Sequence, residues 1–358
     1  MTKNHPIADL ILDWYARSRR DLPWRRTRDP YLIWVSEMML QQTRVDTALP
    51  YYLRFVERFP TVEELARADL QEVLKVWENL GYYSRARHFH EAAKIVLEEF
   101  QGNIPESLDS LTSLPGVGLY TASAILCFAF GARLPTVDAN VRRVTARIFA
   151  IQGLLDRAAA RRDIHRLAAG LVPRENPGEF NQGLMELGAL VCTARSPSCT
   201  DCPLQAFCLA FQEGTQCEIP RPSASRPVPH KIMASGLVFD FSGRMLIAKR
   251  PDHGLLGGLW KFPGGFLREG EIPEEGLKRS ILEEAGVEIV IAGTLGSVRH
   301  AYSHFRLTGH VFRCFPKNEG GRLPGRGSDL LWKDPERLDE MPLSSVDRKI
   351  LELLRKNG

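Results

Sequence analysis

Four of the chain's seven cysteines lie close together, between residues 192 and 208, in the pattern C-x6-C-x2-C-x5-C. Three kinds of site could use them: disulfide bonds, a structural zinc ion or an iron–sulfur cluster. The first residues are polar and lack the apolar segment of a signal peptide, so we expect a cytoplasmic protein whose thiols stay reduced. Zinc sites usually combine two C-x2-C pairs far apart, whereas each iron of a four-iron cluster takes one thiolate. The spacing therefore favours a cluster over zinc, and both over disulfides, with the ligands Cys192, Cys199, Cys202 and Cys208.

Two acidic residues are candidates for acid–base chemistry. The dipeptide Asp29-Pro30 predicts the start of a helix, which places Glu37 in its middle among apolar residues. Apolar surroundings disfavour a charged carboxyl, raise its pKa and suit it to donate a proton. The alternative is an exposed helix glutamate. Asp138, in the segment LPTVDANVRRV, either serves chemistry or caps the helix that follows it.

The stretch LDSLTSLPGVGLYTASAIL predicts two helices joined by a tight turn at Gly116, Val117 and Gly118. Glycine permits such a turn and leaves backbone N–H groups open at the start of the second helix, where a phosphate can bind. The pattern indicates a helix-hairpin-helix. The alternative is an ordinary turn between two helices of the core.

The net charge is only +4, but the arginines are clustered. Six lie in the segment ARSRRDLPWRRTRDPY and three in VRRVTAR. Basic patches with aromatic residues suit a nucleic-acid surface, because phosphates attract them over a long range. The alternative is a solvated face. The most apolar helical segment, residues 121–132, is too short to span a bilayer, so we expect no membrane association.

The segments that carry these residues have helical periodicity. From residue 5 to about residue 210, apolar residues recur at three and four positions. Residues 217–231 are rich in proline and predict a semi-rigid linker. Beyond it we expect several strands, with a hairpin of 233–241 and 245–250 around the turn FSGR, and two helices. The chain is thus expected to have an all-α N-terminal part and a C-terminal α+β domain.

The order of these motifs resembles the endonuclease III superfamily of DNA glycosylases, and several segments resemble its adenine DNA glycosylase family. Those segments are SEMMLQQTRVDTALPYYLRFVERFPTVEELA, NLGYYSRAR and FNQGLMELGALVC. The resemblance implies a helical glycosylase domain over residues 1–216, with a six-helix barrel and a subdomain whose loop 192–208 holds a [4Fe–4S] cluster. It also implies a Nudix-like lesion-recognition domain over 232–358, joined by the linker at 217–231.

The resemblance implies that the enzyme hydrolyses the N-glycosidic bond of adenine mispaired with 8-oxoguanine or guanine in double-stranded DNA. Glu37 would protonate the leaving base and help to activate water, while Asp138 would stabilise an oxocarbenium-like sugar. Asn140 and Tyr120 match family positions that support this site. Relatives that also cut the backbone carry a lysine where Tyr120 stands, and a phenol cannot form an imine, so we expect a monofunctional glycosylase. The family usually has glycine where Ala139 stands, which would matter if that position needed a positive φ.

Further positions match family residues that contact the mispaired bases. Arg25 and Gln182 would hold the flipped adenine. Four of the residues that would contact 8-oxoguanine also have a purely structural alternative. It is core packing for Leu80 and Tyr82, and an ordinary turn at a strand end for Ser303 and His304. We expect a monomer that acts at the nucleoid. The residues expected to lie beside or contact 8-oxoguanine are Gln42, Thr43, Leu80, Tyr82, Ser303 and His304.

Residues 265–287 are close to a Nudix box, G-x5-E-x7-R-E-U-x-E-E-x-G-U, where U is a bulky aliphatic residue. Ser280 stands where the box has its first helix glutamate. Enzymes of this fold hold Mg²⁺ with those glutamates, so a weak second activity as a nucleotide pyrophosphohydrolase stays open. We favour lesion recognition for this domain. A third alternative is a DNA-binding protein without catalytic activity.

Overall fold

The computed structural model describes residues 5–221, 227–317 and 329–357. The chain divides into two compact units. The N-terminal unit comprises Met1–Ala66 and Glu91–Ser225, and the C-terminal unit comprises Arg67–His90 and Arg226–Gly358. The C-terminal unit therefore includes residues 67–90, which fall within the expected glycosylase domain. The middle of the expected linker, residues 222–226, lies outside the described residues.

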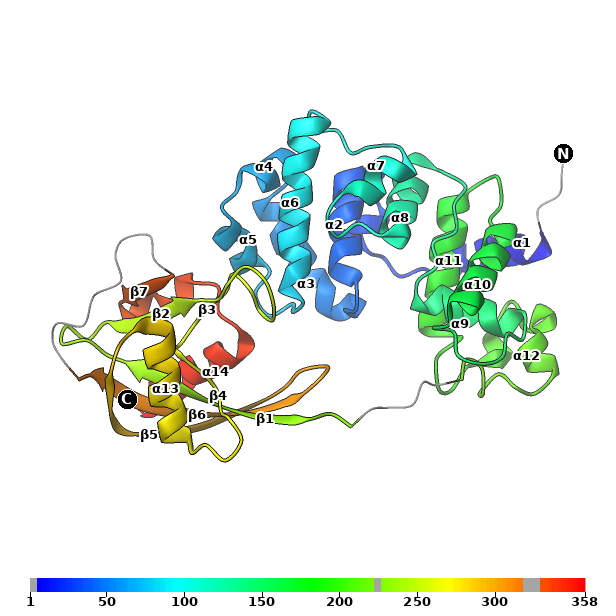
Figure 1. Cartoon of the computed structure of the whole chain (residues 1–358). Helices are drawn as coiled ribbons and strands as arrows, with labels where there is room; N and C mark the ends of the chain where they lie inside the picture. Colours follow the sequence, from blue (N-terminus) through cyan, green and yellow to red (C-terminus); the bar gives the residue numbers. More distant parts are fainter. Residues whose placement is uncertain (1–4, 222–226, 318–328, 358) are drawn as a thin grey trace. The chain divides into compact units, whose positions relative to one another are not determined.

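The N-terminal unit is helical in all its described elements, as predicted (Figure 1). Helices α4 and α6 cross the boundaries between the two units. In the part of the chain that the structure describes, no helix combines the length and the apolar character needed to span a membrane. The helices are α1 (Pro6–Ser18), η1 (Pro23–Arg25), α2 (Pro30–Leu40), α3 (Val45–Arg58), α4 (Val62–Arg67), α6 (Tyr83–Glu99), α7 (Leu108–Ser113), α8 (Leu119–Phe130), α9 (Ala139–Ile148), α10 (Ala158–Leu171), α11 (Pro177–Leu190), η2 (Cys199–Asp201), η3 (Gln205–Phe207) and α12 (Leu209–Gln212).

Two groups of helices build this unit. Helix α2 packs against α3 and α8, and α11 packs against α1 and α9. The approach of α11 to α9 is close at Gly188, where an added Cβ would lie 2.6 Å from the Cβ of Asn140. Apolar side chains such as Ile11, Val144 and Phe180 fill the core between α1, α9 and α11. Burial of this apolar surface holds the helices together.

Local capping sets where two of these helices begin. The Asp29 carboxylate accepts hydrogen bonds from the N–H groups of Tyr31 and Leu32 and starts α2, as the sequence predicts. Asp138 starts α9 in the same way, because its Oδ1 accepts a hydrogen bond of 2.6 Å from the N–H of Val141. Glu37 and Asp138 are therefore held on helices with defined starts.

The predicted helix-hairpin-helix is formed by α7, a turn and α8. Gly116 in the turn has a φ of +75°, a left-handed conformation that disfavours any residue with a side chain. Gly118 is the N-cap of α8 and has no neighbour within 4 Å of the position of an added Cβ. The N-terminal N–H groups of α8 lack intrahelical partners. The turn therefore presents open backbone donors beside exposed glycines.

The C-terminal unit contains two sheets, with strand orders β4-β1-β6-β5 and β3-β2-β7. The predicted hairpin of residues 233–241 with 245–250 is wrong, because β1 and β2 belong to different sheets. Strand β1 pairs in parallel with β6 on one edge and antiparallel with β4 on the other, so only one bridge joins it to the segment of β2. The elements are α5 (Leu70–Val76), β1 (His230–Val238), β2 (Met245–Lys249), β3 (Trp260–Lys261), β4 (Gly264–Phe266), α13 (Pro273–Ala285), β5 (Ile289–Ala301), β6 (Arg306–Pro316), β7 (Leu330–Lys333), η4 (Pro335–Glu340) and α14 (Ser345–Asn357).

Two helices cover the larger sheet of this unit (Figure 1). Helix α13 packs on β1 and β4 through Leu277 and Ile281, and α14 packs on β5. The residues of the Nudix box run from β4 into α13. The predicted α+β architecture is confirmed, and the box forms one strand–loop–helix segment.

Candidate active site

A pocket of about 780 Å³ in the N-terminal unit collects side chains from η1, α2, α3, α8, α9 and α11 and from the loop between α2 and α3. We call it the Glu37 pocket. The other predicted base contacts, Leu80, Tyr82, Ser303 and His304, belong to the C-terminal unit. The predicted catalytic and base-binding residues of the N-terminal unit all line the Glu37 pocket: Arg25, Glu37, Gln42, Thr43, Tyr120, Asp138, Asn140 and Gln182.

Glu37 is the buried acid of this pocket. Only 5% of the residue is exposed, and its Oε2 has no hydrogen-bond partner among the described residues. Burial raises the pKa of the carboxyl to about 7; a hydrogen bond with Tyr120 acts in the opposite direction, and the charge of Asp138 raises it further. A carboxyl with this pKa carries a proton at neutral pH in a large share of molecules. The alternative of an exposed helix glutamate is wrong.

Asp138 both caps α9 and lines the Glu37 pocket, so its two alternatives are compatible. Burial raises its pKa above the ordinary value, while hydrogen bonds from Val141 and Asn140 and the charge of Arg143 oppose that shift. The side-chain N–H of Asn140 donates to Oδ2 of Asp138 at 2.9 Å, and Arg143 donates to the amide oxygen of Asn140 at 2.9 Å. This chain of donors orients the carboxylate and favours its charged form.

Ala139, which stands in place of the family glycine, is the first residue of α9. It does not belong to the described residues with positive φ. An alanine is therefore compatible with the backbone at this position, and the departure does not disturb the helix that carries Asp138.

Tyr120 closes the pocket beside Glu37 at the start of α8. Burial of its hydroxyl, next to the carboxyls of Glu37 and Asp138, raises its pKa well above the ordinary value. The phenol is therefore neutral and acts as a hydrogen-bond partner of Glu37. The side chain that faces Glu37 here is therefore a neutral hydroxyl and carries no amine.

Glu186, which no motif of the sequence indicates, organises the base-binding side of the pocket. This carboxylate is 1% exposed and accepts hydrogen bonds from Arg20 at 2.7 Å and from Arg25 at 2.8 Å. Burial alone would raise its pKa, but the hydrogen bonds from the two arginines lower it to about 2. Glu186 therefore stays charged and fixes the Arg25 guanidinium at the wall of the pocket. Its partners lie 161 and 166 residues away along the chain, so no local pattern reveals the pairing.

Gln182 lies one helical turn before Glu186 on α11, and its amide is also held. The hydroxyl of Tyr15 donates a hydrogen bond of 2.5 Å to its Oε1. The amide N–H₂ group is left to donate toward the pocket, where it could bind an acceptor on a base. Tyr15 on α1 is a second residue that no motif of the sequence indicates.

The four clustered cysteines line a separate cavity of about 20 Å³, and all are free thiols. The Arg147 guanidinium donates to Sγ of Cys192 at 3.2 Å and to the carbonyl oxygens of Thr193 and Ala194. In the described ranges, no group of three His, Cys, Asp or Glu side chains converges as a site for a single metal ion. Four separate thiols on one cavity are the donor set of a four-iron cluster, in which each iron takes one thiolate.

The arginines that cluster in the sequence do not form a single exposed surface. Arg20 and Arg25 point to Glu186, and Arg143 donates to the carbonyl oxygens of Cys192 and Gly188. Arg147 is 1% exposed. These residues connect the helices and the cysteine loop, so part of the expected basic surface has a structural task.

In the C-terminal unit, basic side chains pair with the glutamates of the Nudix box. Glu271 and Glu283 pair with Arg279 at 2.7 and 3.0 Å. Glu284 pairs with Lys261, whose Nζ lies 2.6 Å from its Oε1 and 2.8 Å from the carbonyl oxygen of Gly264. An ammonium group thus lies between a carboxylate of the box and the carbonyl oxygen of the residue before it, which are oxygen ligands of the kind that a divalent cation prefers.

The remaining predicted contacts differ in exposure. Leu80 is 6% exposed, whereas Tyr82 is 45% exposed and has a φ of +49°. Ser303 and His304 lie in the exposed loop between β5 and β6, where Ser303 Oγ and His304 Nδ1 are 3.3 Å apart. Tyr82, Ser303 and His304 are therefore free to meet a ligand, and Leu80 is largely packed.

Comparisons with known proteins agree with this geometry. Residues 35–169 match the HhH-GPD superfamily of base excision DNA repair proteins, and residues 234–353 match the NUDIX domain. Residues 192–208 match the iron-sulfur binding domain of endonuclease III. The predicted iron–sulfur cluster is thereby confirmed over zinc and disulfides.

The chain is 36% identical over 400 residues to an adenine DNA glycosylase of Arabidopsis thaliana, in an alignment that covers 95% of this chain and 63% of that protein. It is 33% identical over 366 residues to an adenine DNA glycosylase of Buchnera aphidicola subsp. Acyrthosiphon pisum, covering 100% of this chain and 99% of that protein. The structure of a thermostable thymine-DNA glycosylase is similar with a TM-score of 0.54 and 33% identity, over 57% of this chain and 95% of that chain. The chain therefore belongs to the adenine DNA glycosylase family.

Proposed function

We propose that this protein hydrolyses the N-glycosidic bond of adenine mispaired with 8-oxoguanine, or with guanine, in double-stranded DNA. The observation that carries the proposal is the buried Glu37 carboxyl, with a pKa of about 7, in one pocket with Asp138. The relatives named adenine DNA glycosylase support the choice of base.

In the proposed reaction, protonated Glu37 donates its proton to N7 of adenine while the bond between C1′ and N9 breaks. The bond's electron pair leaves with the base, and the sugar becomes an oxocarbenium ion. Asp138, oriented by Asn140, stabilises that positive charge. A water molecule then attacks C1′ and gives a proton to the Glu37 carboxylate. Tyr120 orients Glu37 and offers no amine for an imine, so the product keeps an intact backbone.

Base binding is assigned to the wall made by α11 and η1. A flipped adenine needs donors and acceptors on its edge and a planar partner for its ring. Gln182, held by Tyr15, would donate to the base, and Arg25, held by Glu186, would lie against it. Gln42 and Thr43, in the loop between α2 and α3, would contact the opposite strand.

Contacts to the rest of the duplex follow from the hairpin and the C-terminal unit. Gly116, Val117 and Gly118 form the turn assigned to a phosphate. The N–H of Val117 donates to the carbonyl oxygen of Leu114 at 3.1 Å and holds the turn, so the N–H groups of Gly116 and Gly118 would bind the phosphate. Tyr82 would enter the stack beside the orphaned base, and Ser303 with His304 would recognise 8-oxoguanine. Leu80, which is largely buried, would pack below Tyr82 and hold residues 80–82 in place.

The cluster is assigned a scaffold role, with Cys192, Cys199, Cys202 and Cys208 as its ligands. When bound, it supplies a covalent junction between four points of the loop, and all four thiolates are used. Arg147 holds the same loop from the side of α9. The chemistry therefore remains with Glu37 and Asp138.

The second activity, nucleotide pyrophosphate hydrolysis, receives little support from the contacts of the box. Ser280 contributes no carboxylate, and the Lys261 ammonium already neutralises Glu284. We infer that the C-terminal unit serves recognition. Incubation with nucleoside triphosphates and Mg²⁺ tests this inference: we expect no release of phosphate or pyrophosphate. Release that Glu283→Gln abolishes would establish the hydrolase instead.

The direct test of the proposed chemistry is single-turnover release of adenine from an A:8-oxoguanine duplex by the variants Glu37→Gln and Asp138→Asn. Each change is expected to lower the rate roughly 100-fold or more, because it removes the proton donor or the stabilising charge. Wild-type rates in either variant would overturn the assignment. Intact duplex with the wild-type protein would favour DNA binding without catalysis.

A further inference from the structure

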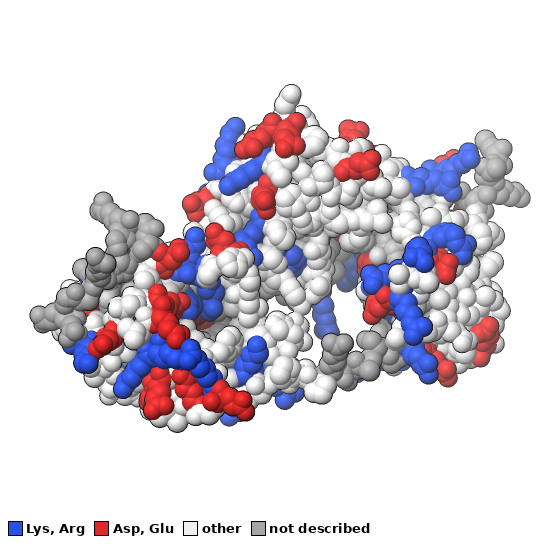
Figure 2. Space-filling model, viewed as in Figure 1, with Lys and Arg blue, Asp and Glu red and all other residues white. Residues whose placement is uncertain are grey.

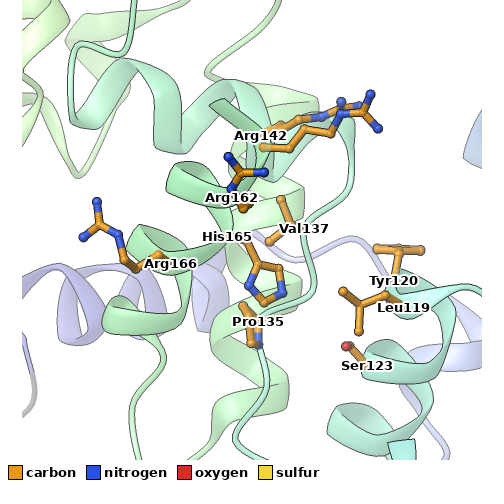
Figure 3. Close-up of a pocket in the computed structure, with 10 residues that line it drawn as sticks. Leu119, Tyr120, Ser123, Pro135, Val137, Arg142, Arg162, His165 and Arg166 are labelled. Atoms are coloured by element: carbon orange, nitrogen blue, oxygen red, sulfur yellow. The ribbon is translucent and has the colours of Figure 1, made fainter. Parts of the chain in front are cut away.

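A second pocket of the N-terminal unit has a volume of about 580 Å³ and is not used by the proposed reaction (Figure 3). We call it the arginine pocket, after the four arginines that line it: Arg142, Arg161, Arg162 and Arg166. It shares one residue, Tyr120, with the Glu37 pocket. The two pockets are therefore neighbours on either side of this side chain.

One wall of the arginine pocket is strongly basic. Arg162 and Arg166 are four residues apart on α10, and so are Arg161 and His165, so the two members of each pair are neighbours on the helix surface. All four side chains line the pocket. Arg142 on α9 completes this wall (Figure 3). Like charges at this spacing repel one another, so a bound anion would relieve an unfavourable interaction.

The arginines of this wall have few strong partners. Arg166 pairs with Asp163 at 3.3 Å, where both side chains are exposed and water weakens the pair. Arg142 lies 3.4 Å from a largely exposed Asp156. Arg162 has no hydrogen-bond or ion-pair partner in the residues that the structure describes. Arg161 is the exception, because its guanidinium donates to the carbonyl oxygen of Asp156 at 2.7 and 3.0 Å. The guanidinium groups of Arg142, Arg162 and Arg166 are therefore available to bind an external anion.

Arg142 differs in this respect from the two arginines nearby on α9. Arg143 donates to Asn140 and to carbonyl oxygens of α11 and the cysteine loop, and Arg147 is buried against that loop. Their guanidinium groups are used inside the fold. Arg142 is the arginine of the VRRVTAR segment that lines the arginine pocket.

The rest of the lining is mostly apolar. Leu119, Pro135 and Val137 present apolar surface, and Tyr120 and Ser123 add a ring and a hydroxyl group (Figure 3). A bare phosphate would use only the basic wall, whereas the volume lies in the range that encloses an organic ligand. An anion with a sugar and a planar base attached, such as one nucleotide with its phosphates, fits both the basic and the apolar part of the lining.

The position of the arginine pocket identifies the source of that nucleotide. Leu119 and Tyr120 directly follow the hairpin glycine Gly118, so the pocket begins where the phosphate-binding turn ends. Figure 2 shows basic side chains gathered over the part of the molecule that α9 and α10 occupy. The arginine pocket thus adjoins the hairpin and, through Tyr120, the Glu37 pocket.

We propose that the arginine pocket binds a nucleotide that flanks the flipped adenine, with Arg162 and Arg166 on its phosphates. The inference rests on the proposed function and adds a site for the adenine-bearing strand. The pocket would extend the grip on that strand beyond the hairpin. Phosphate contacts of this kind add affinity without reading sequence.

The test compares wild-type protein with the double variant Arg162→Gln/Arg166→Gln. The probe is an A:8-oxoguanine duplex that carries a non-hydrolysable 2′-fluoro-deoxyadenosine, and its Kd is measured over a range of salt concentrations. Loss of two phosphate contacts should lower the slope of log Kd against log salt by about 2. The variant Arg162→Lys/Arg166→Lys should restore most of that slope, which separates charge from folding. An unchanged slope in the glutamine variant would overturn the proposal.

The matched control is Lys94→Gln/Arg174→Gln, which removes two exposed charges of the same unit outside both pockets. It should leave the salt slope within error of wild type. Neutral methylphosphonate linkages beside the adenine supply a second arm: they should weaken wild-type binding and have little further effect on the glutamine variant. The same linkages in the opposite strand should weaken both proteins equally, and the reverse pattern contradicts the proposal.

A third arm distinguishes a free nucleotide from the DNA strand. Titration with dAMP should give no saturable binding at micromolar concentration. Micromolar binding lost in the glutamine variant, with unchanged duplex affinity, would assign the pocket to a free nucleotide and overturn the proposal. The wild-type excision assay decides the proposed function separately: adenine release with an unchanged salt slope refutes only the arginine pocket.

Discussion

At the scale of single residues, the central feature is a carboxyl that is kept from ionising. Glu37 has a pKa of about 7 because burial disfavours its charge. Excision by the free enzyme should therefore be fastest below pH 7 and fall as the pH rises through that value, because the proton donor is lost. The fall of kcat/KM between pH 6 and pH 9 measures the loss of this proton. A rate that stays constant from pH 6 to pH 9 would show that Glu37 is not the acid.

The same residue should make the stability of the fold depend on pH. The pKa of Glu37 is raised from 4.5 in the unfolded chain to about 7 in the folded one. Its contribution to stability is fully present below pH 4.5 and is lost as the pH rises through 7. Glu37→Gln should thus raise the free energy of unfolding at pH 8.5 by an amount on the order of 2–3 kcal/mol. Urea unfolding tests this, and an equal gain at pH 4.5 and pH 8.5 would contradict it.

At the scale of elements, α11 carries both the base-binding amide and the buried ion pair. Glu186→Gln leaves two arginines beside a neutral amide and should destabilise the N-terminal unit by about 3 kcal/mol at pH 7. The pKa of Glu186 lies at about 2, below the unfolded value of 4.5, so this stability is present above pH 4.5 and is lost as the pH falls toward 2. The urea midpoint measures the change. Glu179→Gln, an exposed position on the same helix, should change it little.

The turn of the helix-hairpin-helix can be tested through its left-handed glycine. Gly116→Ala places a side chain at a φ of +75° and should destabilise the turn by about 1–2 kcal/mol. DNA affinity, measured by fluorescence anisotropy, should fall with it because the open N–H groups lose their arrangement. Gly170→Ala, in α10 with nothing within 4 Å of the added Cβ, is the control that should keep full affinity. Equal affinities for the two variants would argue against a role of the turn.

Sequence patterns predict these elements to different degrees. The start of α2, the hairpin and the caps of α9 follow from short-range chemistry, so Asp29, Gly116 and Asp138 could be read directly from the chain. Pairings over a long range could not be. Glu186 meets Arg20 and Arg25 across more than 160 residues, and β1 leaves its sequence neighbour β2 to pair with β6. Such contacts depend on tertiary packing, which local periodicity does not encode.

At the scale of the whole molecule, the chain combines a unit that contains the proposed chemistry with a unit that carries the Nudix-like fold. The double variant Ser303→Ala/His304→Ala removes two exposed polar side chains from the loop between β5 and β6. It should lower the preference for A:8-oxoguanine over A:G roughly 30-fold, since each of the two lost hydrogen bonds contributes about 1 kcal/mol. Single-turnover rates on the two duplexes give the ratio. An unchanged ratio would remove this loop from lesion recognition.

The most direct test of the proposed adenine excision is a single-turnover assay on four duplexes, with adenine opposite 8-oxoguanine, guanine, cytosine or thymine. We predict release of free adenine that is fastest opposite 8-oxoguanine and slower opposite guanine, with little release opposite cytosine or thymine. The strand should break only after alkali treatment, because Tyr120 cannot form an imine. Equal rates on all four duplexes, or no adenine from the 8-oxoguanine duplex, would contradict the proposed removal of adenine opposite 8-oxoguanine.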